Sequence, residues 1–202
     1  MRLGIFGGTF DPVHNGHLLL AEYCREQGEL DQVWFLPAFA PPHKLEYQLT
    51  ASEHRIEMLQ LAIGGHSDFL VSTIEIERGG VSFTVDTVQA IAQQCPDVDL
   101  FLLMGADSLC DFPTWREPAR ICQLAIPLVV GRPNYSTLDL DLLRPLVDES
   151  RWKKIQDCFV EMPGMDISSR DIRERVSRQQ SIRYQTPRAV EKYIETNGLY
   201  HK

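Results

Sequence analysis

Long hydrophobic runs are missing from this 202-residue sequence. No uninterrupted apolar stretch approaches the roughly 20 residues that a membrane-spanning helix needs. No basic segment followed by an apolar stretch precedes Leu3-Gly4-Ile5-Phe6 either, so no secretion signal is expected. These absences predict a soluble, cytoplasmic protein with no membrane partner.

Positive charge is also scarce, because 20 lysine and arginine residues stand against 28 aspartate and glutamate residues, giving a formal net charge of −8. A surface that binds nucleic acid carries clustered lysine and arginine over a broad face, so we expect no nucleic-acid partner. A local basic cleft in an acidic protein can still bind a small anion.

Cysteines are few and form no C-x-x-C pair. Their scattered positions predict reduced thiols rather than a disulfide framework or a zinc site. They are Cys24, Cys95, Cys110, Cys122 and Cys158. No group of aspartate, glutamate and histidine has the spacing of a dedicated metal site, so we predict no metal held by the protein itself.

Short apolar runs alternate with longer helical patterns, which is typical of a parallel sheet with crossover helices. With 44% hydrophobic residues, a chain of this length can bury one sizeable core, and we expect one domain over residues 1–202. The predicted strands are Leu3–Phe6, Val33–Leu36, Phe69–Ile74, Leu100–Met104, Ile126–Val130 and, more weakly, Cys158–Met162.

Helices are predicted at Leu18–Gln27 and Thr84–Gln94, and a capping box at Thr50-Ala51-Ser52-Glu53 predicts another through Ile63. Two more helix starts, at Ser168-Ser169-Arg170-Asp171 and Thr186-Pro187, and a stop at Asn197-Gly198 predict a compact helical C-terminus over about 164–202. Loops rich in proline and glycine at 37–44, 111–118 and 131–136 each follow a predicted strand. In open α/β sheets, ligands bind at that edge.

The segment Gly7-Gly8-Thr9-Phe10-Asp11-Pro12-Val13-His14-Asn15-Gly16-His17 lies between the first strand and the first helix. Glycines allow close approach of a ligand, and a helix N-terminus favours phosphate, so His14 and His17 could reach one polyphosphate together. The alternative is that both histidines only cap the helix. The segment lacks the G-K-S/T of a Walker loop and the G-x-G-x-x-G spacing of a dinucleotide fingerprint.

This segment resembles the T/H-x-G-H loop of the nucleotidyltransferase superfamily, in the version of the bacterial nicotinate-mononucleotide adenylyltransferases. Further motifs of that family follow in the expected order over nearly the whole chain. They are Pro41-Pro42-His43-Lys44, Ser82-Phe83-Thr84-Val85-Asp86-Thr87, Gly105-Ala106-Asp107-Ser108 with Trp115-Arg116, and Ile167-Ser168-Ser169-Arg170-Asp171-Ile172-Arg173. Arg170 stands where threonine is usual, which puts only that side chain's role in doubt.

The resemblance implies a doubly wound, Rossmann-like parallel sheet and assigns residues to three roles. Catalytic residues would be His14, His17, Lys44 and Arg173. ATP would contact Gly7, Gly8, Thr9, Phe10, His14, His17, Gly105, Asp107, Ile167, Ser168, Ser169 and Arg173. The mononucleotide would contact Phe10, Lys44, Thr84, Trp115 and Arg132.

Each assignment has a plainer alternative on sequence alone. Lys44 can be a solvated surface lysine, and Trp115 a core residue beneath its loop. The serine-rich segment with Arg173 can be an ordinary N-cap beside an exposed arginine. Asp107 and Thr84 can be helix caps, although a helix N-terminus favours a carboxylate as readily as a phosphate.

The implied reaction joins nicotinate mononucleotide to ATP, giving nicotinate adenine dinucleotide and pyrophosphate in NAD biosynthesis, with Mg²⁺ arriving on ATP. The nearest rival enzyme is a pantetheine-phosphate adenylyltransferase, which usually has threonine where this chain has His14. A rival of another class is a regulatory module that binds nucleotide without turnover. The oligomeric state is left open, a homo-oligomer included.

Overall fold

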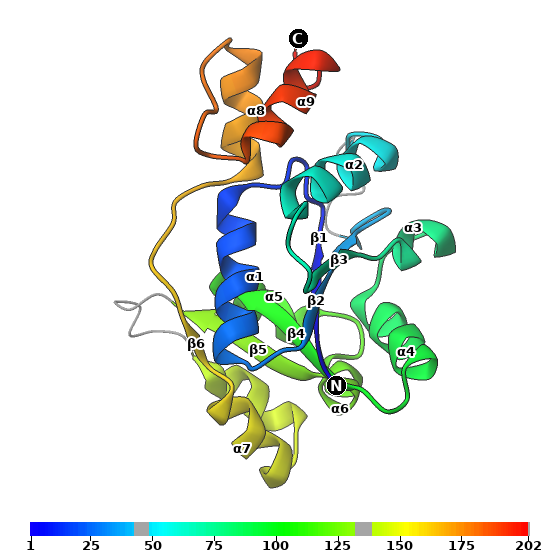
Figure 1. Cartoon of the computed structure of the whole chain (residues 1–202). Coiled ribbons are helices and arrows are strands. Elements are labelled where there is room, and N and C mark those ends of the chain that lie inside the picture. The colour runs from blue at the N-terminus through cyan, green and yellow to red at the C-terminus, as the bar shows by residue number, and fades with distance from the viewer. Residues whose placement is uncertain (43–48, 132–138, 202) are drawn as a thin grey trace.

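The computed structural model describes residues 1–42, 49–131 and 139–201. Its centre is a six-stranded sheet in the order β3-β2-β1-β4-β5-β6, with every neighbouring pair parallel. The strands are β1 (Arg2–Gly8), β2 (Gln32–Pro37), β3 (Phe69–Val71), β4 (Asp99–Gly105), β5 (Ile126–Gly131) and β6 (Val160–Glu161). Helices flank this sheet (Figure 1), and the strand order reverses between β1 and β4. The predicted doubly wound α/β fold is therefore confirmed.

The predicted strands match the observed ones within two residues at each end, with one exception. The run Phe69–Ile74 is wrong at its end, because β3 stops at Val71 and Ile74 begins the short helix α3 (Ile74–Arg78). β3 lies at the edge of the sheet and pairs with β2 only over Phe69–Val71. The apolar character of Ile74 reflects packing of α3 against the core.

The predicted helices are present as α1 (Asn15–Gln27), α2 (Ser52–Ile63), α4 (Thr84–Gln94), α8 (Ser169–Ser177) and α9 (Arg188–Thr196). Further short helices have no counterpart in the sequence-based prediction, because too few turns are present to give a clear period. They are α5 (Ala106–Asp111), α6 (Pro118–Leu124), α7 (Glu149–Asp157) and the 3₁₀ helices Phe112–Thr114 and Leu140–Leu146. The loop 111–118 accordingly follows α5 rather than β4.

Two predicted helix caps are wrong. The N-cap of α2 is Ala51, which has no side-chain cap, and Thr50 instead accepts a hydrogen bond from Arg55 through its carbonyl. Thr84 is the first residue of α4, and the N-cap position belongs to Phe83. The N-cap Ser168 is confirmed, since its hydroxyl accepts the amide of Asp171 at 3.1 Å.

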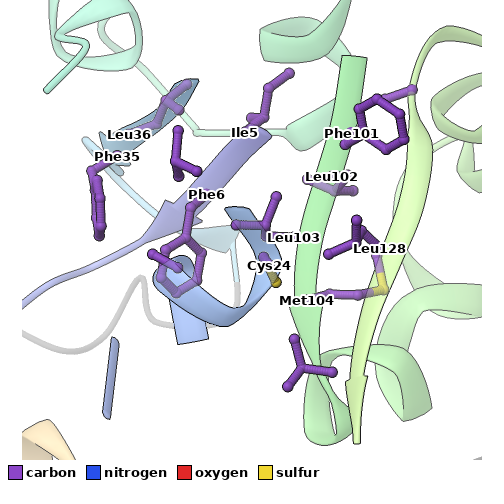
Figure 2. Packing of buried hydrophobic residues seen from close by; sticks show 14 of the residues in the cluster. Ile5, Phe6, Cys24, Phe35, Leu36, Phe101, Leu102, Leu103, Met104 and Leu128 are labelled. Atoms are coloured by element: carbon purple, nitrogen blue, oxygen red, sulfur yellow. The ribbon is translucent and has the colours of Figure 1, made fainter. Parts of the chain in front are cut away.

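The core lies between the sheet and the helices that cover it. Figure 2 shows Phe6, Leu103 and Leu128, from three neighbouring strands, beside Cys24 of α1. Each large apolar side chain buried there contributes about 1.5–3 kcal/mol. Burial raises the pKa of the Cys24 thiol, and the structure has all five cysteines free.

The helices α8 and α9 lie together at one end of the molecule, next to α2 (Figure 1). α9 packs against α2, and the Tyr193 hydroxyl lies 2.8 Å from Nδ1 of His54. This position carries α8 and the segment before α9 to the loop that follows β1. Among the residues described, no helix has the length and apolar character needed to cross a membrane.

Candidate active site

The loop between β1 and α1 is held in place by hydrogen bonds to its main-chain carbonyls. A buried carbonyl without a partner costs free energy, and each of these carbonyls accepts a hydrogen bond from a different part of the chain. The donors are the Ala38 amide to Gly8, the Arg55 guanidinium to Thr9, Arg173 to Asp11, the Ser169 hydroxyl to Pro12 and the Thr186 hydroxyl to Val13. The loop that carries the two histidines is therefore held in one conformation.

His14 and His17 form a reciprocal cap at the N-terminus of α1. The amide of His17 donates to Nδ1 of His14, and the amide of His14 donates to Nδ1 of His17, each at 3.3 Å. A ring nitrogen that accepts a hydrogen bond carries no proton, so each ring in its neutral form holds its proton on Nε2. Both histidines therefore do cap α1, and for His14 the Nε2–H group is the donor that the neutral ring can offer to a ligand.

The charge state of His14 follows from its burial. Desolvation lowers the pKa of His14 to about 4, because the imidazolium would be taken out of water. His14 is therefore neutral at neutral pH, in the form that its Nδ1 contact requires. A neutral imidazole can still donate from Nε2 to a phosphate oxygen.

A cavity of about 440 Å³ lies against the histidine pair at the carboxyl edge of the sheet. It brings together five of the residues predicted to contact ATP: His14, His17, Gly105, Asp107 and Ile167. They come from β4, α5, the start of α1 and the segment before α8. The cavity therefore lies at the reversal of strand order, where open sheets bind ligands.

The other predicted residues of the serine-rich motif are not among those that line this cavity. Ser168 caps α8, while Ser169 donates to the carbonyl of Pro12 at 2.8 Å and Arg173 donates to the carbonyl of Asp11. Ser168 therefore does cap α8, while its predicted contact with ATP stays a prediction. Ser169 and Arg173 meet the histidine loop through its backbone.

A second cavity, of about 540 Å³, lies on the other side of β4. Among the predicted residues, Gly7, Gly8, Thr9, Gly105, Thr84 and Trp115 line it. The two cavities share Gly105 and Ser108. The two cavities therefore adjoin at the end of β4.

Trp115 and Thr84 lie on the wall of this larger cavity. Trp115 is half-buried directly after a 3₁₀ helix, and its ring centroid lies 5.1 Å from that of Phe112. It packs against the core, as the alternative predicted, and it also lines the cavity. Thr84 brings the N-terminus of α4 to the same wall.

Phe10 lies beneath the loop instead of on a cavity wall. Its side chain is 1% exposed, and its ring packs against Phe6, Phe35 and His17. A Cβ atom on Gly8 would lie only 3.0 Å from the Phe10 ring, which explains the glycine there. Because the side chain is buried, only the backbone atoms of Phe10 could contact a ligand.

Lys44 and Arg132, predicted to contact the mononucleotide, lie outside the described residues. The same is true of most of the loop 131–136. Within the described parts of the chain, no group of three or more histidine, cysteine, aspartate or glutamate side chains could hold a metal ion.

Several residues at the site were missed by the sequence-based prediction. Arg116 lines the larger cavity, pairs with Asp86 at 3.2 Å and lies over the Phe83 ring with 4.8 Å between Cζ and the ring centroid. Its position directly after Trp115 was the available signal. Arg55 and Tyr200 have no such signal, because the contacts they make are between segments far apart in the sequence.

Comparison with known proteins gives matches over nearly the whole chain. The model of the cytidylyltransferase-like family matches residues 5–175. The "Nicotinate-nucleotide adenylyltransferase" of Bacillus subtilis (strain 168) is 40% identical over 199 residues, which cover 98% of each chain. A "Probable nicotinate-nucleotide adenylyltransferase" of Thermomicrobium roseum is 45% identical over 199 residues, which cover 98% of this chain and 91% of that protein.

The fold is similar to that of solved structures. A Plasmodium falciparum nicotinic acid mononucleotide adenylyltransferase complexed with NaAD superimposes with a TM-score of 0.77 at 19% identity, covering 98% of this chain and 97% of that one. A structure of the Plasmodium falciparum enzyme complexed with APC gives a TM-score of 0.76 at 19% identity, with 98% and 96% covered. This likeness shows a shared fold.

Proposed function

The chain belongs to the cytidylyltransferase-like family and, within it, to the nicotinate-nucleotide adenylyltransferases, and from this premise we propose how its two cavities carry out adenylyl transfer. ATP occupies the cavity beside His14 and His17, and nicotinate mononucleotide occupies the cavity lined by Thr84 and Trp115. The products are nicotinate adenine dinucleotide, a precursor of NAD, and pyrophosphate. One domain over residues 1–202 and a cytoplasmic location belong to the same proposal.

The observation that carries this proposal is the meeting of the two cavities at Gly105 and Ser108. A transfer between two bound nucleotides needs both reacting groups at one place and little covalent chemistry from the protein. The shared wall at the end of β4 supplies such a place. The glycine-rich loop lies beside it and brings main-chain atoms close to the phosphates.

In the proposed reaction, a 5′-phosphate oxygen of the mononucleotide attacks the α-phosphorus of Mg·ATP in line with the leaving group. The new P–O bond forms as the bond between the α-phosphorus and the bridging oxygen breaks, and that oxygen leaves with pyrophosphate. No covalent enzyme intermediate forms. The Nε2–H groups of His14 and His17 donate to phosphate oxygens as charge develops on them, which is worth most when the donors are already in place.

Other residues of the cavity beside the histidines are proposed to bind the rest of the ATP molecule. Asp107 accepts hydrogen bonds from the ribose hydroxyls, and Ile167 packs beside the adenine. Ser168, Ser169 and Arg173 belong to the phosphate side of the proposal. Mg²⁺ arrives with ATP and neutralises part of its charge, held mainly by phosphate oxygens and water.

On the mononucleotide side, the Trp115 ring stacks on the pyridine and the start of α4 at Thr84 faces the carboxylate. A helix N-terminus offers unpaired amides and a partial positive charge, which suit a carboxylate. Lys44 and Arg132 are proposed to contact the phosphate of the mononucleotide.

A pyrophosphate-release assay tests this function. The protein is incubated with Mg·ATP and, in parallel, nicotinate mononucleotide, nicotinamide mononucleotide or phosphopantetheine. We expect release with the pyridine substrates and none with phosphopantetheine. Release with phosphopantetheine alone would identify the rival enzyme, and binding of ATP without release in any mixture would indicate a regulatory module.

A further inference from the structure

Arg55, on the first turn of α2, is buried at the junction of three segments. Arg55 is 1% exposed, and its guanidinium makes four hydrogen bonds to oxygen atoms. Nη1 donates to the carbonyls of Thr9 at 3.0 Å and Ala38 at 2.8 Å, Nε donates to the carbonyl of Thr50 at 2.9 Å, and Nη2 lies 3.2 Å from the Ser52 hydroxyl.

The contacts of Nη1 lie where β1 and β2 separate. The two strands are paired up to Gly8 and Pro37, and the Ala38 amide still donates to the Gly8 carbonyl at 2.9 Å. One residue further on, the Arg55 guanidinium lies between the carbonyls of Thr9 and Ala38. The guanidinium therefore holds the segments that follow β1 and β2 together at the point where the larger cavity opens.

Thr9 and Ala38 both line the larger cavity, so their separation sets its width at that edge. Thr9 also lies in the loop that leads to His14 and His17. A single side chain thus holds the wall of one cavity and the loop that reaches the other.

The stability of the fold alone does not explain why a charged arginine is buried at this position. Burial lowers the pKa of Arg55, which records the cost of taking its charge out of water, while the negative charge of Asp11 offsets part of that cost. Well-packed apolar side chains often replace buried charged groups without loss of stability. The guanidinium is needed where three carbonyls must be held at fixed places by one planar group.

We propose that Arg55 is a positioning residue for the adenylyl transfer, which sets the distance between the histidine loop and the loop after β2 and thereby the fit of the mononucleotide. The proposal rests on the proposed function. It requires the forked geometry of the guanidinium as well as its charge. Lysine keeps the charge but places all its donors on one atom, so it cannot bridge Thr9, Ala38 and Thr50 together.

The test compares Arg55→Lys and Arg55→Met with Arg2→Lys in steady-state assays with nicotinate mononucleotide and ATP. Arg2 is a matched control, since it also reaches a carbonyl, that of Gly28, at 2.8 Å and lies over an aromatic ring, but at the other end of β1. Ser52→Ala is a second control, because it removes only the contact within α2. Thermal unfolding shows the temperature at which all variants are folded for the assay.

For Arg55→Lys we expect kcat/KM for the mononucleotide to fall about tenfold to a hundredfold, with a raised KM for that substrate, since displacement by about 1 Å can cost a hundredfold. Arg55→Met is expected to fall further, so that lysine gives a partial rescue. Arg2→Lys and Ser52→Ala should keep both constants within about twofold, even where the unfolding temperature drops, because neither touches a cavity wall.

Kinetic constants of Arg55→Lys equal to those of Arg2→Lys, at a similar loss of unfolding temperature, would overturn the proposal. So would failure of Arg55→Lys to fold, because Arg55 would then support the fold as a whole. Absence of turnover by the unaltered protein would instead reject the function proposed above, and the two failures are therefore distinguishable.

Discussion

The imidazoles of His14 and His17 lie face to face, with ring centroids 3.6 Å apart and ring planes 19° from parallel. Each ring accepts the other residue's amide at Nδ1, so neither can turn without losing a cap of α1. The pair therefore behaves as one stacked unit at the N-terminus of α1.

The first prediction is that His17→Ala lowers kcat by about 10²–10³, the usual cost of losing one donor to transition-state charge. The KM for the mononucleotide should change much less, because His17 lines the other cavity. His66→Ala is the control, since the His66 ring also stacks on an aromatic ring, that of Phe69 at 3.8 Å, away from both cavities. Near-normal kcat in a folded His17→Ala protein would remove the residue from the mechanism.

The second prediction concerns pH and the His14 imidazole. Its pKa is about 4 in the folded protein and about 6.5 when unfolded, so below pH 6.5 the unfolded state binds the extra proton. Stability is therefore lost as pH falls from 6.5 toward 4. At ~1.4 kcal/mol per pKa unit, His14 accounts for about 2 kcal/mol of the loss between pH 7 and pH 5.

Urea unfolding of His14→Asn at the two pH values measures this contribution. Asparagine can still accept the His17 amide at an N-cap but does not titrate in this range. We expect the stability difference between pH 7 and pH 5 to be smaller in the variant by about 2 kcal/mol. Equal differences in variant and wild type would show that His14 titrates normally in the folded protein.

The third prediction is that Trp115→Ala raises the KM for the mononucleotide severalfold and leaves the KM for ATP nearly unchanged. Trp115 lines only the larger of the two cavities, and ring stacking contributes about 1–3 kcal/mol. Trp152, a buried tryptophan of α7, supplies the control, because Trp152→Ala should lower stability without changing either KM. If Trp115→Ala behaves in the same way, packing is the main role of Trp115.

The fourth prediction is a preference of at least about tenfold in kcat/KM for nicotinate mononucleotide over its amide. The N-terminus of α4 favours a negative group by ~0.3–1 kcal/mol, and hydrogen bonds to a charged group contribute ~1.5–3 kcal/mol. Their sum exceeds the ~1.4 kcal/mol of a tenfold difference. Parallel assays with both substrates measure it, and equal efficiency would refute the carboxylate pocket while leaving adenylyl transfer in place.

The fifth prediction concerns Tyr200, whose hydroxyl donates to Oδ1 of Asp11 at 2.7 Å. Burial, together with the charge of Asp11, raises the pKa of Tyr200, so the hydroxyl keeps its proton and its role as donor. Tyr200→Phe leaves a carboxylate oxygen of the buried Asp11 without this partner, which costs about 1–3 kcal/mol of unfolding free energy. Tyr193→Phe, on the more exposed side of α9, should cost less, and an equal loss in urea unfolding would contradict the assignment.

The sequence pattern was sufficient to predict the strands of the sheet and several of the residues that line the cavity beside the histidines. The four central strands are nearly continuous apolar runs that are mostly buried, and such runs show clearly in a sequence. His14, His17, Gly105, Asp107 and Ile167 meet because parallel strands end at one edge, so adjacent βα loops lie side by side.

The errors arose where tertiary contacts override local preference. Thr50 had the pattern of a capping box, but its carbonyl and amide are occupied by Arg55 and Asp11. The burial of the Phe10 ring beneath Gly8 was likewise not predicted. Neither outcome can be seen in a short window, since both depend on segments that meet only after folding.

The hydrogen bonds that hold the loop carrying His14 and His17 also determine when, during synthesis of the chain, this loop can reach its final structure. The donors to the carbonyls of Asp11, Pro12 and Val13 lie 162, 157 and 173 residues further along the chain. At ~5–20 residues per second, these three carbonyls therefore wait roughly 8 to 35 s for their partners after the loop itself is made. The loop completes its hydrogen bonds only after α8 and the segment before α9 have been synthesised, and binding of nucleotide beside the two histidines depends on that late step.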